Sequence, residues 1–139
     1  EANRVAMLLA VLQRRAGVRL HTREVYVSTV GGARVSEPAC DLATAIAIAS
    51  AAGEVAFASP VVALGEVGLS GELRRVPGLD RRLAEAVRLG FTVALVPAGS
   101  SCRDQPGLKV VEVDSLSAAL TALELPVRRS SPPSLASAG

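Results

Sequence analysis

The stretch from Gly65 to Leu83 constrains the fold more than any other, because it places four glycines, one proline and four arginines between two apolar segments. The apolar run before it, Val61–Leu64, has the composition of a strand, and the segment after it carries apolar residues at helical spacing. Residues 67–73 predict a strand, a tight turn and a second strand, since glycine supplies the positive φ angles that such turns need. The middle of the chain is therefore predicted to be a hairpin that leads into a helix.

The connection between this hairpin and the helix is basic. Pro77 and Gly78 end the second strand, and the helix is predicted to begin at Leu79 or Asp80 and to end at Leu89. Two arginine pairs flank this break, and together we call them the arginine bridge: Arg74, Arg75, Arg81 and Arg82. We expect any anionic partner of the domain to contact the arginine bridge.

Hydrophobic periodicity predicts the remaining elements. Further helices are expected over 2–16, 39–52 and 115–125, with Gly17 and Gly53 ending the first two, and strands over 24–30, 33–35, 91–96 and 108–113. These elements amount to a two-layer α/β domain over residues 1–125. Residues 126–139 are rich in Ser, Pro and Ala, which predicts a disordered tail.

Composition narrows the class of protein. The chain has 139 residues, enough for one domain with its own core, and its basic residues are fourteen arginines and the single Lys109. Arginine suits bidentate contact with phosphate, although a GC-rich genome would also favour arginine codons. Aromatic residues make up 2% of the chain, which argues against a base-stacking platform. No apolar run approaches the roughly 18 residues of a membrane span, so we expect no membrane contact.

The sequence offers poor candidates for nucleophilic catalysis. Cys40 lies at the start of a predicted helix, where the dipole would lower a thiol pKa, yet a small core residue is the favoured interpretation. Cys40 and Cys102 match no metal spacing and indicate reduced thiols in a cytoplasmic protein. The only histidine, His21, has no evident reason to lie beside either thiol. A Ser-Lys dyad would have to use Lys109.

Phosphate and metal motifs are equally weak. Residues 31–34 read Gly-Gly-Ala-Arg, but no Gly-Lys-Ser/Thr follows, so they do not form a P-loop. Glu37 and Asp41 are four residues apart at a helix start, which we interpret as a pair that complements the helix dipole. No other carboxylates have metal spacing. The chain begins Glu-Ala-Asn and enters a helix almost at once, and we interpret it as a fragment of a longer protein.

Several motifs in order carry a resemblance to a known family. They are Asn3–Leu12, Val30–Val35, Glu37–Ala43 and Gly65–Pro77. Together they resemble the C-terminal domain of the RadA (Sms) family of bacterial DNA repair proteins, over about residues 1–125. The resemblance does not extend to the tail.

That domain is similar in turn to the proteolytic domain of the Lon protease, a two-layer α/β fold of the ribosomal protein S5 domain 2-like type. The Lon serine lies in a Gly-Pro-Ser-Ala-Gly motif, and residues 37–41 here read Glu-Pro-Ala-Cys-Asp, so Ala39 stands where the serine would be. The Lon lysine follows Gly-Gly-Leu, and residues 77–80 read Pro-Gly-Leu-Asp, so Asp80 replaces it. Alanine cannot attack a carbonyl, and aspartate cannot supply an amine. The resemblance therefore implies a domain without catalytic residues, with Ala39 and Asp80 as degenerate positions.

The resemblance also implies partners. RadA-like proteins join a zinc-binding segment and a RecA-like ATPase core to this domain, form hexameric rings and act as DNA helicases with the recombinase machinery. ATP, Mg²⁺ and Zn²⁺ are thus implied for the parent protein, and no cofactor is expected in this segment. Ring contacts are expected from helix Ala2–Ala16 and from the hairpin around Leu69. The candidates for contact with DNA phosphates are Arg14, Arg15, Arg34, Arg74, Arg75, Arg81 and Arg82.

Two alternatives stay open at this point. One is a residual peptidase or hydrolase that uses Cys40 with an unforeseen base. The other is a purely structural hexamer scaffold that makes no contact with DNA.

Overall fold

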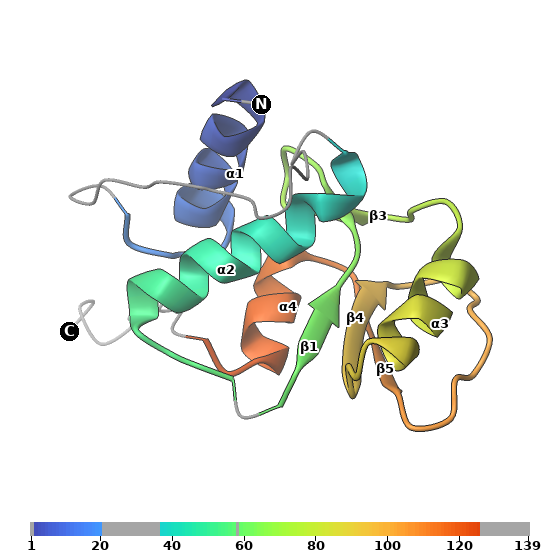
Figure 1. Ribbon diagram of the computed structural model, residues 1–139. Helices are drawn as coiled ribbons and strands as arrows, with labels where there is room; N and C mark the ends of the chain where they lie inside the picture. The colour runs from blue at the N-terminus through green and yellow to red at the C-terminus, as the bar shows by residue number, and fades with distance from the viewer. Residues whose placement is uncertain (1, 21–36, 58, 126–139) are drawn as a thin grey trace, which may run out of the picture.

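A computed structural model describes residues 2–20, 37–57 and 59–125 of the chain (Figure 1). The predicted strands over 24–30 and 33–35, together with His21, Arg34 and the predicted tail, lie outside the described residues. The elements in order are α1 (Ala2–Arg15), the short 3-10 helix η1 (Pro38–Cys40), α2 (Asp41–Gly53), β1 (Val61–Ala63), β2 (Glu66–Val67), β3 (Leu73–Arg74), α3 (Leu79–Arg88), β4 (Val93–Pro97), β5 (Lys109–Val113) and α4 (Leu116–Ala122). Among these helices, none has the length and apolar character needed to span a membrane.

Three parallel strands form the central sheet, in the order β1-β4-β5. Ala94 in the middle strand is paired with Val62 on one side and Val110 on the other. These three residues therefore share one face of the sheet, since side chains alternate along a strand. Pro97 ends β4, where the missing N–H of proline is tolerated.

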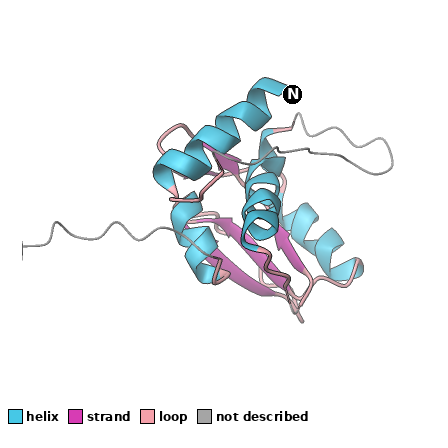
Figure 2. Cartoon of the chain, turned by 90° about the vertical axis from the view of Figure 1, so that its left-hand side faces the viewer, coloured by secondary structure: helices cyan, strands magenta, loops and turns pink. Residues whose placement is uncertain are grey.

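Both faces of this sheet are covered by helices, which differs from the predicted two-layer arrangement. On one face Ala94 and Val96 pack with Leu79 and Leu83 of α3. On the other face Leu95 belongs to the larger core built by α1, α2 and α4. Figure 2 shows helices on both sides of the strands. In Figure 1 the strands of the sheet lie between α3 and the helices α2 and α4. The reason is that β4 presents apolar side chains to both faces of the sheet, so neither face can be left exposed to solvent.

The helices follow their predicted ranges closely, with differences at their ends. Gly17 terminates α1 at φ 70°, as expected. The second predicted helix begins with the 3-10 turn η1, and its left-handed cap is Glu54 at φ 54° rather than Gly53. The last helix ends at Ala122 instead of Leu125, because Glu124 turns left-handed and the N–H of Leu125 bonds back to Leu120 O at 2.9 Å.

The predicted hairpin is present between β2 and β3. Gly71 adopts φ 84° in its turn, and its N–H donates to Gly68 O at 2.9 Å. Gly71 O in turn accepts from the N–H of Leu116 at 2.8 Å, so the hairpin is bonded to the start of α4. The side chain of Ser115 caps that helix by accepting from the N–H of Ala118 at 3.0 Å.

Candidate functional site

The first degenerate position, Ala39, lies in the turn η1 and is 3% exposed. Gly65 fixes this turn from the strand side: its N–H donates to Ala39 O at 3.1 Å, and its carbonyl accepts from the N–H of Leu42 at 3.0 Å. A Cβ added at Gly65 would be in van der Waals contact with Leu42 and Pro97, each at 3.4 Å, so the strand side packs directly on this turn. The turn therefore presents a buried methyl group where the resemblance places a nucleophile.

Cys40 follows Ala39 and is half-buried. Burial raises the pKa of its thiol, Glu37 raises it further, Arg82 lowers it, and Asp41 adds a smaller increase. This direction is opposite to the lowering that a helix start was expected to cause. A thiol that holds its proton more tightly is a weaker nucleophile at neutral pH.

The second degenerate position, Asp80, begins α3 and binds the loop that follows β4. Its Oδ1 accepts from the backbone N–H of Arg103 at 2.7 Å, and its Oδ2 lies 3.9 Å from Arg103 Nε. Asp80 therefore has a structural partner in the position where an amine was expected from the resemblance.

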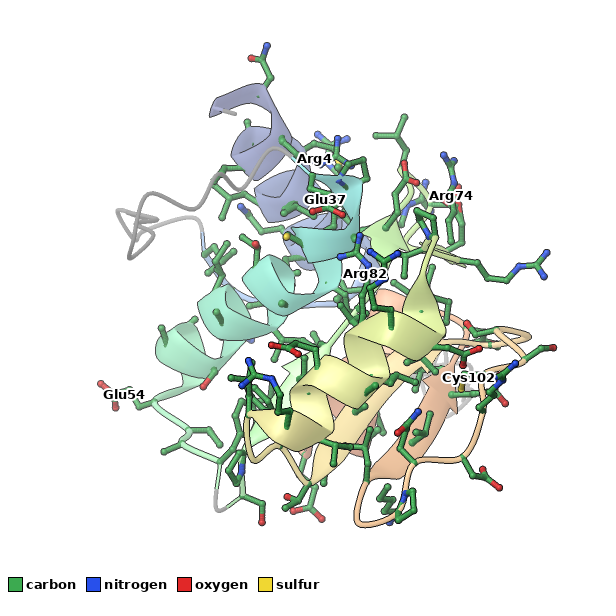
Figure 3. The ribbon with its side chains drawn as sticks, turned by 45° about the vertical axis from the view of Figure 1, so that its right-hand side comes forward. Arg4, Glu37, Glu54, Arg74, Arg82 and Cys102 are labelled. Carbon is green, nitrogen blue, oxygen red and sulfur yellow. The ribbon has the colours of Figure 1, made fainter. Side chains whose placement is uncertain are left out.

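An ion pair joins the elements that carry these two positions. The guanidinium of Arg82 pairs with Glu37, one residue before η1, and its Nε donates to Pro77 O at 3.1 Å. Figure 3 shows Arg82 and Glu37 pointing toward each other. The turn that holds Ala39 is thus tied to the first turns of α3, but the two positions supply neither a nucleophile nor an amine.

Asp41 forms a site that the sequence analysis missed. It is 1% exposed, and it accepts from Arg4 Nε at 2.5 Å, from a terminal nitrogen of Arg4 at 2.7 Å, and from the N–H of Val67 at 3.1 Å. The bond to Asp41 raises the pKa of Arg4, and burial of Arg4 opposes that rise. One carboxylate therefore connects α1, α2 and β2.

This corrects the interpretation of Glu37 and Asp41 as a pair that serves the helix dipole. Glu37 pairs with Arg82, and Asp41 pairs with Arg4. A signal was present in the sequence: Asp41 is the one charged residue in a predicted helix made otherwise of small or apolar residues with two hydroxyls. Such a residue must be buried with a partner or lie at an exposed end.

The arginine bridge divides into two kinds of side chain. Arg74 lies 3.8 Å from Glu66 and 3.9 Å from Glu72, and Arg82 is paired with Glu37 as described above. Arg75 is exposed and donates to Gly99 O at 3.4 Å, a weak contact. Arg81 is also exposed, and within the described residues neither it nor Arg75 has an ion pair.

The other candidate arginines are on a different element. Arg14 and Arg15 form the last turn of α1, where both are exposed. Arg34 lies outside the described residues. The described parts of the chain also contain no group of three or more His, Cys, Asp or Glu residues placed to hold a metal ion.

The chain belongs to the family described as subunit ChlI of Mg-chelatase, which matches residues 4–100. Over most of its length it is also homologous to the bacterial DNA repair protein RadA, as the resemblance predicted.

The RadA relatives match at substantial identity. The chain is 51% identical over 120 residues to the DNA repair protein RadA of Mycolicibacterium smegmatis, covering 86% of this chain and 26% of the relative. It is 44% identical over 124 residues to RadA of Pseudomonas aeruginosa, covering 88% and 27%, and 40% identical over 125 residues to RadA of Escherichia coli, covering 89% and 27%. The chain thus spans about a quarter of the length of these curated relatives.

Proposed function

We propose that this chain is a Lon-like domain without peptidase activity that serves a RadA-type DNA repair ATPase as a ring-assembly unit and a sequence-independent DNA contact. The observation that carries the proposal is which side chains occupy the two degenerate positions and what they contact. Ala39 is a buried methyl group, and the Asp80 carboxylate is bonded to Arg103. A peptidase of the Lon type needs a nucleophile and an amine at these positions, so the proposal assigns the role of the domain to its surface.

The DNA contact is assigned to the arginine bridge, led by Arg75 and Arg81. Both are exposed, and neither has a carboxylate partner among the described residues. Arg74 and Arg82 would first have to leave Glu66, Glu72 or Glu37, which reduces what a phosphate contact would contribute. Homology to DNA repair proteins supports the same partner.

The test is the salt dependence of duplex binding by the full-length protein, measured by fluorescence anisotropy. Each phosphate contact contributes about 0.9 to the slope of log K against log salt, so Arg75→Gln with Arg81→Gln should reduce its magnitude by about 2. Arg88→Gln is the matched control, because that arginine is already paired with Glu85 on α3.

Two outcomes would contradict this assignment. An unchanged slope in the double variant would remove Arg75 and Arg81 from the DNA contact. No binding to duplex DNA at low salt would leave the purely structural scaffold as the better account.

Ring assembly needs an apolar contact, and the structure narrows where it could lie. Leu8 of α1, expected at a subunit contact, is 1% exposed and belongs to the core of its own chain. Leu89, at the end of α3, is 61% exposed. Leu69, at the tip of the hairpin that was also expected at a subunit contact, is 75% exposed. Because Leu69 lines a groove along α1, the proposal uses Leu89 as the apolar anchor between subunits, and the hairpin contact stays a prediction.

A further inference from the structure

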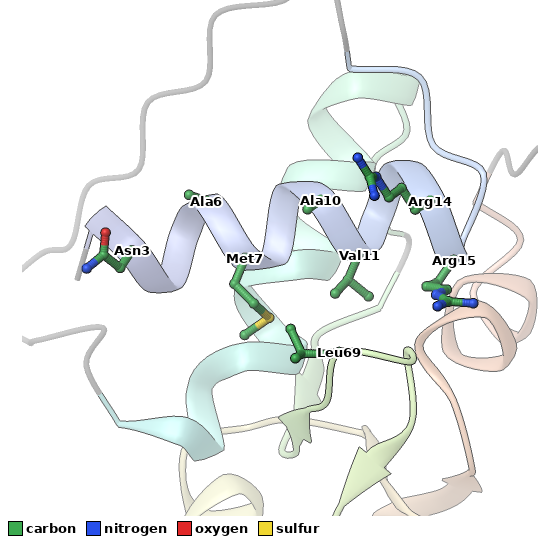
Figure 4. Close-up of a pocket in the computed structure, with 8 residues that line it drawn as sticks. All are labelled: Asn3, Ala6, Met7, Ala10, Val11, Arg14, Arg15 and Leu69. Atoms are coloured by element: carbon green, nitrogen blue, oxygen red, sulfur yellow. The ribbon is translucent and has the colours of Figure 1, made fainter.

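A groove of about 500 Å³ runs between α1 and the tip of the β2–β3 hairpin (Figure 4). Met7 and Val11 line it from the helix, and Leu69 lines it from the hairpin. Arg14 and Arg15 line it near the end of α1. The groove is therefore apolar in its middle, with Asn3 at one end and the two arginines at the other.

The hairpin tip beside the apolar part packs against the end of α1. Leu69 is 75% exposed, although Met7 beside it is half-buried. Gly71 fixes the tip at φ 84°, and a Cβ added there would come within 3.2 Å of Arg15 Cβ, so the tip packs closely on the end of α1. Leu69 thus stands exposed on an ordered turn, and covering it would remove apolar surface from water. Methionine adapts to the shape of an incoming side chain.

Within the described residues, the charge at the basic end is uncompensated. Among the described residues, no carboxylate lies within ion-pair distance of Arg14 or Arg15, and no acidic side chain lines the groove. An occupant that brought both an apolar side chain and carboxylates would match this pattern.

Other occupants fit less well. If two copies of the chain met symmetrically at this groove, neither would bring a carboxylate to the arginines of the other, because no acidic side chain lines the groove. Duplex DNA would supply phosphates to the arginines, but its backbone has no apolar group to contact Leu69.

We propose that this groove binds an acidic amphipathic segment of a partner protein. An apolar side chain of that segment lies between Met7 and Leu69, and its carboxylates lie over Arg14 and Arg15. This partner is additional to the proposed DNA contact, which uses the arginine bridge. Binding of such a segment would assign Arg14 and Arg15 to protein recognition instead of contact with DNA phosphates.

The experiment uses a fluorescein-labelled synthetic helical peptide with leucines on one face and glutamates on the other, titrated with the full-length protein. Leu69→Ser is expected to weaken binding about tenfold, the effect of losing one buried leucine contact. Arg14→Gln with Arg15→Gln should weaken it and flatten its salt dependence. Arg19→Gln is the matched control, because Arg19 is exposed and does not line the groove.

Several results would overturn the inference. Equal binding of a peptide with lysines in place of the glutamates would remove the charge argument. Unchanged peptide binding by Leu69→Ser, with wild-type thermal unfolding, would remove the groove. Loss of self-association in Leu69→Ser would show that a second copy covers it, and competition by duplex DNA that depends on Arg14 and Arg15 would return these residues to the DNA contact. Failure of duplex binding through Arg75 and Arg81 would leave the peptide result unaffected, so the two proposals can fail separately.

Discussion

The carboxylate of Asp41 is nearly closed to solvent, and its contacts cross between elements that are distant in the chain. It accepts a bidentate pair from Arg4, 37 residues away, and the N–H of Val67, 26 residues away. A buried carboxylate is tolerated only when its acceptor capacity is used, and these three bonds use it. Removing it would leave the guanidinium of Arg4 without its partner and the N–H of Val67 without an acceptor.

We therefore expect Asp41→Ala to lower the free energy of unfolding by about 3 kcal/mol. Urea denaturation followed by circular dichroism measures this loss. Glu85→Ala is the control, because the Glu85–Arg88 pair lies on the surface of α3 and its removal should leave the midpoint nearly unchanged. Equal midpoints for the two variants would mean that the buried pair has no stabilising role.

Cys40 allows a direct test of the remaining hydrolase alternative. Because burial raises the pKa of its thiol, the thiolate fraction at neutral pH is smaller than in a free thiol. In a Cys102→Ser background at neutral pH, iodoacetamide should therefore react more slowly with Cys40 than it reacts with the free thiol of glutathione. The rate of Cys40 labelling should keep rising as pH increases. Mass spectrometry gives the rates. Fast labelling at neutral pH would restore Cys40 as a candidate nucleophile.

At the scale of elements, the cap of α2 is strained. Glu54 has φ 54°, a left-handed conformation that costs a residue with a Cβ roughly 1–2 kcal/mol, and its N–H donates to Ala51 O at 3.2 Å to close the helix. Glu54→Gly should raise the free energy of unfolding by about 1 kcal/mol, measured by thermal unfolding. Ala47→Gly, at an exposed position inside the same helix, should lower it by a similar amount. Destabilisation by both substitutions would contradict this account of the cap.

The sequence predicted elements whose determinants are local. The hairpin and the start of α3 follow from Gly71 and Gly78, both at positive φ. Where a prediction missed, the cause was a contact between neighbouring elements: the strand predicted from Phe91 begins at Val93, because the N–H of Phe91 bonds to Ala86 O at 3.0 Å and finishes α3.

The site was predictable to a lesser extent. Motif order predicts Ala39 and Asp80 as the degenerate positions, because a linear motif needs no knowledge of packing, and this assignment stays a prediction. The partners of charged side chains were not predictable in this way. Asp41 finds Arg4 only because α1 packs across α2, and that packing is decided by apolar side chains elsewhere in both helices. For the same reason the arginine bridge could be named from sequence, but not its division into paired and unpaired side chains.

At the scale of the whole molecule, the two most exposed leucines among the described residues have different proposed roles: Leu89 in the subunit contact and Leu69 in the groove. Leu89→Ser should weaken self-association of the full-length protein about tenfold, because it removes one exposed leucine from the proposed subunit contact. Sedimentation velocity over a range of concentrations measures the change. Leu69→Ser is the matched control and should assemble as the wild type does. The reverse pattern would move the subunit contact to the hairpin.

The bonds of Asp41 have a consequence for the groove, although Asp41 does not line it. One wall of the groove is α1, which Arg4 ties to the carboxylate, and the other is the hairpin, which Val67 ties to the same carboxylate. The Asp41 carboxylate thus connects both walls of the groove before any ligand binds. The groove would lose little conformational entropy when a segment binds. Affinity at this surface should therefore depend on preorganisation as well as on contact.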